Sequence, residues 1–271
     1  DLVFNQIIDM AARLLFSLGL VMFVSQTYVS AQIGTLLASL VGLTVVIYQL
    51  KPVFSAKPSN FEHHKWPIKS LGWTSFLLAA SYSTMYSIDI ILVKHYFPIH
   101  IAGIYGALST ASKIIFFAEA PIGSALLPVV ARKVGHPSLA RVDLLILLSM
   151  ISVVGAGIVG IYFLIPELII KVIFTDKFIE AAQYLPWIGI ALFLYSLAGI
   201  SANFLLALGK VRSAYAGVVA LFAEIVLLTI FHSSLWQVIF SLTVVFGILA
   251  LVLTIYSFHI TRNHATNQSF K

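Results

Sequence analysis

The sequence contains no cysteine and very little charge. Of its 271 residues only 10% are charged, whereas 60% are hydrophobic. The absence of cysteine excludes a disulfide framework, a thiolate nucleophile and a Cys-based metal site. The eight histidines show no HExxH-type spacing, so we expect no metal and no other cofactor. A single soluble domain of this length cannot bury so many apolar residues, and the composition therefore predicts an all-α protein that crosses a membrane several times.

The positive charge is spread between apolar runs. A net charge of +6 would in a soluble protein suggest a nucleic-acid partner. Here the basic residues lie mainly in polar loops, as is typical of the cytoplasmic loops of membrane proteins, so no nucleic acid is expected. The chain also lacks a basic segment followed by a short apolar run and a small-residue cleavage site, and we predict no signal peptide.

Apolar windows of about twenty residues, long enough to cross the hydrocarbon of a bilayer, recur about eight times. The expected helices cover residues 3–24, 29–50, 68–92, 101–130, 142–164, 180–208, 211–230 and 236–260. The apolar segment PELIIKVIF after position 165 is too short to span, so we interpret Pro166–Lys177 as a re-entrant or interfacial piece.

A proline-containing loop divides the chain. We expect two helices in residues 1–52, a loop between lobes at 53–67, six helices in 68–260 and a polar tail at 261–271. If the dividing loop is cytoplasmic, eleven Lys and Arg residues fall on that side and three on the other. Positive residues are retained in the cytoplasm, so this split predicts an even number of spans with both termini cytoplasmic.

Ionisable residues within one predicted hairpin point to a polar cavity. The hairpin covers residues 81–132, SYSTMYSIDIILVKHYFPIHIAGIYGALSTASKIIFFAEAPIGSALLPVVAR. Asp89 lies at the end of its first helix, and Lys113 and Glu119 lie in its second helix. A charged side chain inside a membrane costs at least about 2.5 kcal/mol unless it is paired or faces water. These residues therefore suggest the central cavity of a transporter.

Three sequence runs resemble a known family. They are IAGIYGALSTASKI, APIGSALLPVVAR and the later FTDKFIEAAQYLPWIGIALFLYSLAGISANFLLALGKVRSAY. They are similar to the polysaccharide and oligosaccharide (lipid-linked sugar, O-antigen type) flippases of the multidrug/oligosaccharidyl-lipid/polysaccharide exporter superfamily. The resemblance implies twelve helices in two lobes packed as a V. The chain would then hold the last two helices of the first lobe and the complete second lobe, without the first four helices.

Two basic residues are candidate substrate ligands. Asp9 and Arg13 are four residues apart on one helix face, a spacing that favours an ion pair. Arg13 could line the cavity and bind a diphosphate, or it could neutralise Asp9 between two helices. Lys113 lies near the middle of its helix, where its ammonium could bind phosphate; alternatively it could reach the membrane surface or pair with a neighbouring carboxylate.

The acidic residues and the prolines leave similar alternatives. Asp89 could line the cavity or be an interfacial charge. Glu119 and Glu224 are candidate ion-coupling groups, although a lone buried acid that is hydrogen-bonded would look the same in the sequence. Pro121 removes a backbone donor and, with Gly123, is a candidate hinge, yet prolines also occur in membrane helices without a function.

The resemblance implies a flippase that moves a lipid-linked oligosaccharide or polysaccharide repeat unit across a bacterial-type cytoplasmic membrane by alternating access. Its expected partners are this lipid-linked substrate, membrane lipid, and a polysaccharide polymerase with its chain-length partner. The alternative is a drug/cation antiporter of the same superfamily. Such a transporter binds cations, so it would use an acidic cavity. A membrane-embedded enzyme of the same pathway would need a larger loop than any in this chain, so we predict no enzyme.

Overall fold

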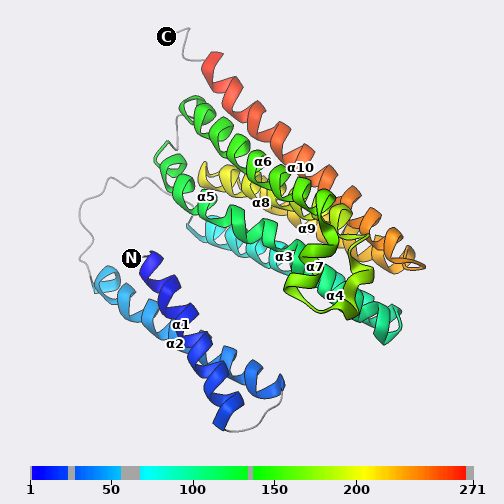
Figure 1. Cartoon of the computed structure of the whole chain (residues 1–271). Coiled ribbons are helices and arrows are strands. Elements are labelled where there is room, and N and C mark those ends of the chain that lie inside the picture. Colours follow the sequence, from blue (N-terminus) through cyan, green and yellow to red (C-terminus); the bar gives the residue numbers. More distant parts are fainter. Residues whose placement is uncertain (1, 24–27, 56–67, 134–136, 267–271) are drawn as a thin grey trace. The chain divides into compact units, whose positions relative to one another are not determined.

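The protein is all-α over the residues described by the computed structural model, which are 2–23, 28–55, 68–133 and 137–266. Figure 1 shows its helices. The α-helices are α1 (Leu2–Phe23), α2 (Tyr28–Ser55), α3 (Ile68–Tyr96), α4 (Ile99–Ser112), α5 (Ile114–Ala131), α6 (Arg141–Leu164), α7 (Pro166–Ile173), α8 (Leu185–Ala207), α9 (Arg212–Ile230) and α10 (Leu235–Thr266). Two short 3-10 helices, Pro137–Ala140 and Asp176–Ala181, join some of them. The prediction of an all-α membrane fold is confirmed.

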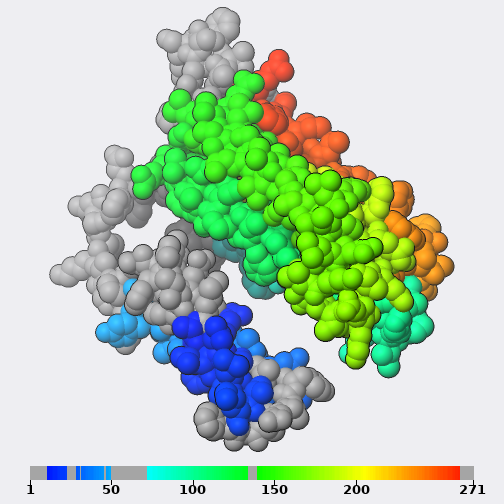
Figure 2. Space-filling model, viewed as in Figure 1, coloured from blue at the N-terminus to red at the C-terminus, as the bar shows by residue number. Residues whose placement is uncertain are grey.

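Seven spans within the described residues are long and apolar enough to cross a membrane. They lie in α2, α3, α4 with α5, α6, α8, α9 and α10. The predicted first helix also forms, but its apolar part within the described residues, Ala11–Met22, is shorter. Side chains such as Val153 on α6 and Val172 on α7 are about three-quarters exposed, and Figure 2 shows these helices on the outer surface. Exposed apolar surface of this extent fits contact with lipid.

The chain divides into two compact units, Asp1–Trp66 and Pro67–Lys271. In the first unit, α1 and α2 form a hairpin whose backbones approach closely at Gly34. A Cβ atom at this glycine would lie 2.5 Å from the Cα atom of Ser17. Small residues allow such close helix packing in membranes, where no hydrophobic force drives helices together.

The second unit is built around α8. This helix packs against α5, α6 and α10, while α3 packs against α9 (Figure 1). Leu185, Ile188 and Leu205 of α8 are fully buried in this core. A tight turn joins α8 to α9 through Gly209, whose φ angle is +74°. The N–H groups of Gly209 and Lys210 donate to the carbonyls of Leu206 and Leu205, both at 2.8 Å, which closes the helix as a Schellman motif.

Two helix boundaries differ from the sequence-based expectation. The helix expected from residue 180 begins as an α-helix only at Leu185, because Pro186 has no N–H and fits best in a first helical turn. The helix expected at 101–130 is divided at Lys113 into α4 and α5, although Lys113 keeps helical φ and ψ angles of −66° and −11° and its N–H still donates to the carbonyl of Ser109 at 3.2 Å. Next to this break, the hydroxyl of Tyr162 in α6 donates to the carbonyl of Ala111 at 2.7 Å. A contact from another helix thus satisfies a backbone group at the interruption.

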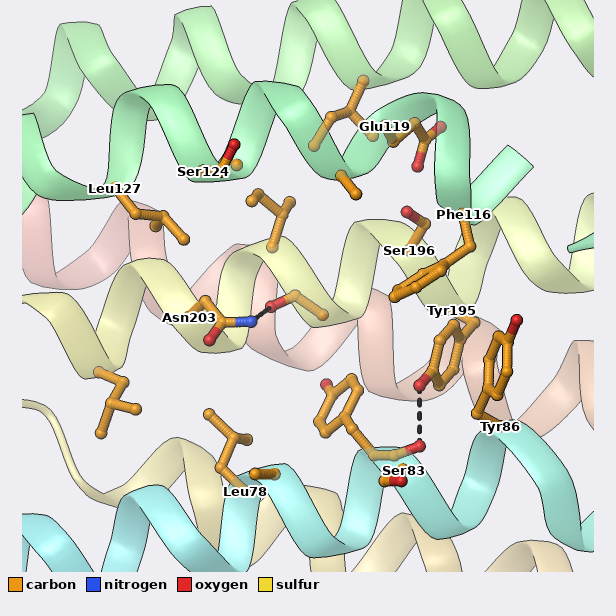
Figure 3. A pocket seen from close by; sticks show the side chains of 18 of the residues that line it. Leu78, Ser83, Tyr86, Phe116, Glu119, Ser124, Leu127, Tyr195, Ser196 and Asn203 are labelled. Atoms are coloured by element: carbon orange, nitrogen blue, oxygen red, sulfur yellow. Dashed lines mark hydrogen bonds between the residues drawn. The ribbon is translucent and has the colours of Figure 1, made fainter. Parts of the chain in front are cut away.

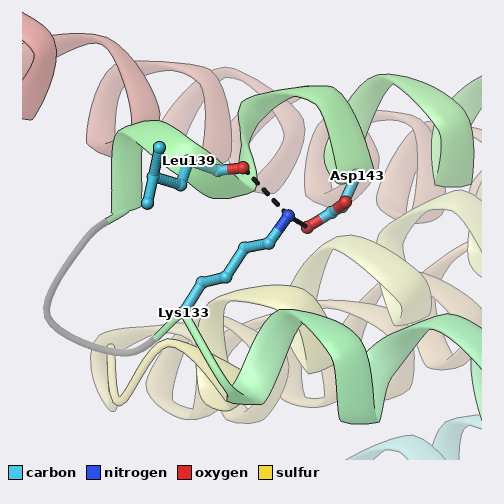
Figure 4. A network of polar contacts seen from close by, with 3 residues as sticks. All are labelled: Lys133, Leu139 and Asp143. Carbon is cyan, nitrogen blue, oxygen red and sulfur yellow. Dashed lines mark hydrogen bonds and ion pairs between the residues drawn. The ribbon is translucent and has the colours of Figure 1, made fainter.

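A polar contact fixes the connection between α5 and α6 (Figure 4). The ammonium of Lys133 lies 2.6 Å from Oδ2 of Asp143 and donates to the carbonyl of Leu139 at 3.1 Å. Asp143 lies in the first turn of α6, where a carboxylate also interacts favourably with the helix dipole.

Candidate functional site

A cavity of about 660 Å³ opens within the second unit (Figure 3). Its walls come from α3, α5, α6 and α8. This volume is within the usual range of about 300–1,000 Å³ for small-molecule sites. The residues that line it are Ser75, Leu78, Ala79, Tyr82, Ser83, Tyr86, Phe116, Glu119, Ala120, Gly123, Ser124, Leu127, Ile151, Tyr195, Ser196, Gly199, Ile200, Asn203 and Leu206. The lining therefore combines apolar, aromatic and hydroxyl groups with one carboxylate.

Four aromatic rings form one end of this cavity. The ring centroids of Tyr86 and Phe116 are 5.3 Å apart, and those of Phe116 and Tyr195 are 6.1 Å apart. Tyr82 lies 5.5 Å from Tyr195, whose hydroxyl donates to the backbone carbonyl of Tyr82 at 2.8 Å (Figure 3). We call these four residues the aromatic wall. Tilted rings at such distances attract one another, so each ring in the wall is stabilised by its neighbours.

Glu119 provides the carboxylate of the cavity lining. It is only 2% exposed, and the hydroxyl of Ser196 lies where it stabilises the charge of the carboxylate. The side chain of Ser196 lies beside it (Figure 3). On its other side Glu119 packs against Gly155 of α6, where a Cβ atom would overlap its Oε1. The carboxylate is therefore held between α5, α6 and α8.

Lys113 sits at the break between α4 and α5, close to the aromatic wall. Its Nζ atom lies 4.1 Å from the ring centroid of Tyr86, which is a cation–π contact. The side chain is partly exposed. The contact with Tyr86, which lines the cavity, places the ammonium at the Tyr86 end of the cavity.

A second polar cluster lies behind the aromatic wall. Oδ2 of Asp89 accepts a hydrogen bond from the hydroxyl of Tyr105 at 2.7 Å and a longer one from Ser109 at 3.4 Å. Oδ1 of Asp89 and both oxygens of Glu224 have no partner in the described ranges, although Glu224 is fully buried. The two carboxylates repel each other electrostatically, while the charge of Lys113 attracts Asp89. Two acids in one buried cluster require a proton or a bound cation to be stable.

Comparison with known families decides which kind of protein carries this cavity. Residues 75–230, more than half of the chain, match the MatE family. The chain belongs to the MatE family. No curated protein matches the sequence, and no solved structure matches it either. MatE proteins are transporters of the multidrug/oligosaccharidyl-lipid/polysaccharide exporter superfamily, and this chain is accordingly a multi-pass membrane transporter.

The MatE match contains the cavity and most of the predicted site residues. Lys113 and Glu119 lie at or near the cavity, and Asp89 and Glu224 come together in the cluster behind it. Gly123 lines the cavity, and a Cβ atom there would lie 2.8 Å from Cδ1 of Ile200. Gly123 therefore packs against α8, and its role in a hinge stays a prediction.

The predicted hinge and the predicted ion pair both stay predictions. Pro121 lies inside α5, and a hinge at this residue is not tested by one conformation. Arg13 belongs to α1 of the first unit, where its side chain is exposed. The side chain of Asp9 lies outside the described residues. The pairing of Asp9 with Arg13 therefore stays a prediction.

Sequence reasoning missed the aromatic wall. Tyr82, Tyr86 and Tyr195 were not predicted as site residues, because an aromatic ring in a membrane span usually faces lipid or marks an interface. Their hydroxyl groups were the available signal, since a phenol in the middle of a span needs a polar partner or water. No group of three or more His, Cys, Asp or Glu side chains within the described ranges could hold a metal ion.

Proposed function

We propose that this MatE-family chain moves a lipid-linked oligosaccharide or polysaccharide repeat unit across the cytoplasmic membrane by alternating access. The observation that supports this most directly is the cavity itself, where an aromatic and hydroxyl-rich lining has an ammonium group at one end. Rings and hydroxyls suit a sugar, and a lysine suits the phosphate that joins the sugar to its lipid. The lipid tail would stay in the bilayer. Arg13, in the first unit, is proposed separately as a candidate phosphate ligand.

Replacing Lys113 by methionine tests the phosphate contact. Methionine keeps an apolar chain against Tyr86 but removes the charge, so export should fall about tenfold or more while membrane abundance stays near wild type. The change is made in the chromosomal gene of the host, and surface glycan is measured together with membrane abundance. Lys94→Met, at an exposed site on α3, is the matched control. Unchanged glycan export in Lys113→Met would disprove the phosphate contact.

A drug/cation antiporter is the second candidate. Glu119 favours it, because a buried carboxylate in the cavity lining would attract an organic cation. Loss of cationic-dye efflux in Glu119→Gln cells with normal surface glycan would favour this candidate. Asp89 and Glu224 are proposed as the ion-coupling pair under either function. The polymerase and chain-length proteins remain proposed partners of the flippase.

The proposed orientation places both termini in the cytoplasm. It rests on the eleven-to-three division of Lys and Arg residues between the two sides. Single cysteines at Arg132 and Arg212 should be protected from an impermeant thiol reagent in intact cells, whereas cysteines at Pro98 and Ser233 should react. Because the chain has no cysteine of its own, labelling has no background from it. The opposite labelling pattern at these four positions would refute the orientation.

A further inference from the structure

Helices α3 and α9 pack along one seam. Partway along it, a Cβ atom at Gly217 would lie 2.9 Å from Oγ of Ser81. At its far end, just beyond α9, the ring of His232 stacks on that of Tyr96 with the centroids 4.1 Å apart. Fifteen residues separate these two contacts in both segments of the chain. The two helices therefore run in the same direction, and their residues face each other in one register.

This register brings two acids and an apolar layer into line beneath the stacked rings. Asp89 faces Glu224, and the two carboxylates repel each other. One turn nearer the rings, Val93 faces Leu228, and both line a small void next to the rings. The stacked rings, the apolar layer and the acid pair thus follow one another along the seam.

The apolar layer closes the way from the rings to the acids. Val93 and Leu228 are each only 2% exposed. The void beside them is also lined by Leu92, Phe97 and Val238. It is too small to hold a water molecule. His232 lies eight residues beyond Glu224, which corresponds to about 12 Å along a helix, so nothing passes between them by this route until the layer opens.

His232 is suited to bring protons to this layer. It lies between the membrane-spanning parts of α9 and α10, and the proposed orientation places it outside. Imidazole is the side chain that ordinarily gains and loses a proton between about pH 5 and 8. The Nδ1 atom of His232 is buried and has no hydrogen-bond partner in the part of the chain that the structure describes. The other titratable groups at this end of α3 are Lys94, His95 and Tyr96, whereas α10 presents the apolar Val238.

Of the two acids, Glu224 is the one that accepts a proton. Asp89 accepts hydrogen bonds from Tyr105 at 2.7 Å and from Ser109 at 3.4 Å. The charge of Lys113 also attracts Asp89, and all of these contacts stabilise an ionised carboxylate. Glu224 is fully buried and has no such donor among the described residues, so burial and the charge of Asp89 both oppose its ionised form.

We propose that His232 delivers the coupling proton from outside to Glu224 along the seam between α3 and α9, with Val93 and Leu228 as the gate. The imidazole takes a proton from outside water on Nε2 and releases one from Nδ1. When the gate opens, water carries this proton to the carboxylate of Glu224, which becomes neutral. The structure shows the gate closed. The assignment rests on the proposed coupling role of Asp89 and Glu224, and it adds the ion, its route and its side of entry.

Time-resolved infrared spectroscopy on the full chain in detergent micelles tests the route, with protons released by light from a caged compound. A carboxylate that binds a proton gains a C=O band, and the band that Glu224→Gln removes belongs to Glu224. His232→Gln should slow the rise of this band about tenfold or more, because a positioned acid–base group speeds proton transfer by about 10²-fold or more. The final height of the band and the pH of half-protonation should stay at their wild-type values. A residue that only packs would not change the rate alone.

Val93→Thr tests the gate independently. Threonine has the shape of valine but brings a hydroxyl into the apolar layer, so water should enter more easily and the band should rise faster than in the wild type. An unchanged rate would overturn the gate. Thermal unfolding verifies that each variant is folded, and Val93→Thr decides if His232→Gln is not.

The matched control is His100→Gln, which makes the same exchange at an exposed position on α4 and should leave the rate unchanged. The route is overturned if Glu224 is protonated at the wild-type rate in His232→Gln. It is also overturned if His232→Gln shifts the pH of half-protonation, which would indicate a structural role. The absence of any Glu224-dependent band in the wild type would overturn it as well.

The failure of the route and that of the coupling role give different results. If Glu224→Gln loses transport but no band depends on Glu224, the coupling role remains with a bound cation and only the proton route is wrong. If the band depends on both Glu224 and His232 but transport is normal in Glu224→Gln, the coupling role is wrong and the proton route remains.

Discussion

Replacing Gly155 by valine is expected to remove most of the folded protein from the membrane. Even a Cβ atom at this position would overlap the ring of Phe193 and Oε1 of Glu119, so α6 could not keep its distance from α5 and α8. Overpacking of this kind typically costs about 1–3 kcal/mol, and the two further methyl groups of valine add to it. A loss of this size is a large part of the stability of a folded domain. The measurement is membrane abundance together with the thermal unfolding of purified protein.

Gly157→Val provides the matched control. This glycine lies on the same helix two residues further on, and a Cβ atom there would meet no atom within 4 Å. Both variants exchange glycine for the same β-branched residue, so differences in helix propensity cancel. Equal unfolding temperatures for the two variants would show that the junction between α5, α6 and α8 is not closely packed.

Replacing Glu224 by glutamine is expected to abolish coupled transport without loss of protein. Glu224 is fully buried, its oxygens have no partner in the described part of the chain, and its charge opposes that of Asp89. A neutral amide removes a desolvated charge, so membrane abundance should stay level or rise. If this pair holds the coupling ion or proton, transport should fall by more than tenfold. Surface glycan per unit of membrane protein is the quantity to measure.

Glu180→Gln is the control for this experiment, because it makes the same exchange at an exposed position in the 3-10 helix before α8. It should leave both abundance and transport unchanged. Normal transport in Glu224→Gln would assign Glu224 a packing role. A fall in abundance together with transport would instead indicate that the carboxylate stabilises the fold.

The membrane helices could be predicted from the sequence because twenty consecutive apolar residues are a signal of composition. Each of the eight predicted segments contains α-helix, seven spans within the described residues are long enough to cross a membrane, and PELIIKVIF is, as expected, too short to span. The break at Lys113 could not be predicted, since the strongest local signal, Pro121, lies eight residues further on. The interruption lies beside the hydrogen bond from Tyr162, which is distant in sequence.

The candidate site was predictable only in its charges. Lys113, Glu119 and Glu224 stand out because ionisable residues are rare in membrane spans. Which of them share a cavity depends on how α3, α5, α8 and α9 pack, and one sequence does not contain that information. Tyr86 and Tyr195 are common residue types in apolar helices, and only the packing of the helices shows that they line the same cavity as Glu119.

The interruption at Lys113 also has a consequence for how the protein fits its bilayer. The span Ile99–Ala131 has 33 residues, which would make a straight helix about 50 Å long, compared with about 30 Å of hydrocarbon. Even at a tilt of 40° it would still be about 38 Å tall, so a single straight rod would leave apolar turns outside the lipid. A bend at Lys113, where α4 meets α5, would let the two pieces tilt by different angles and so reduce this height.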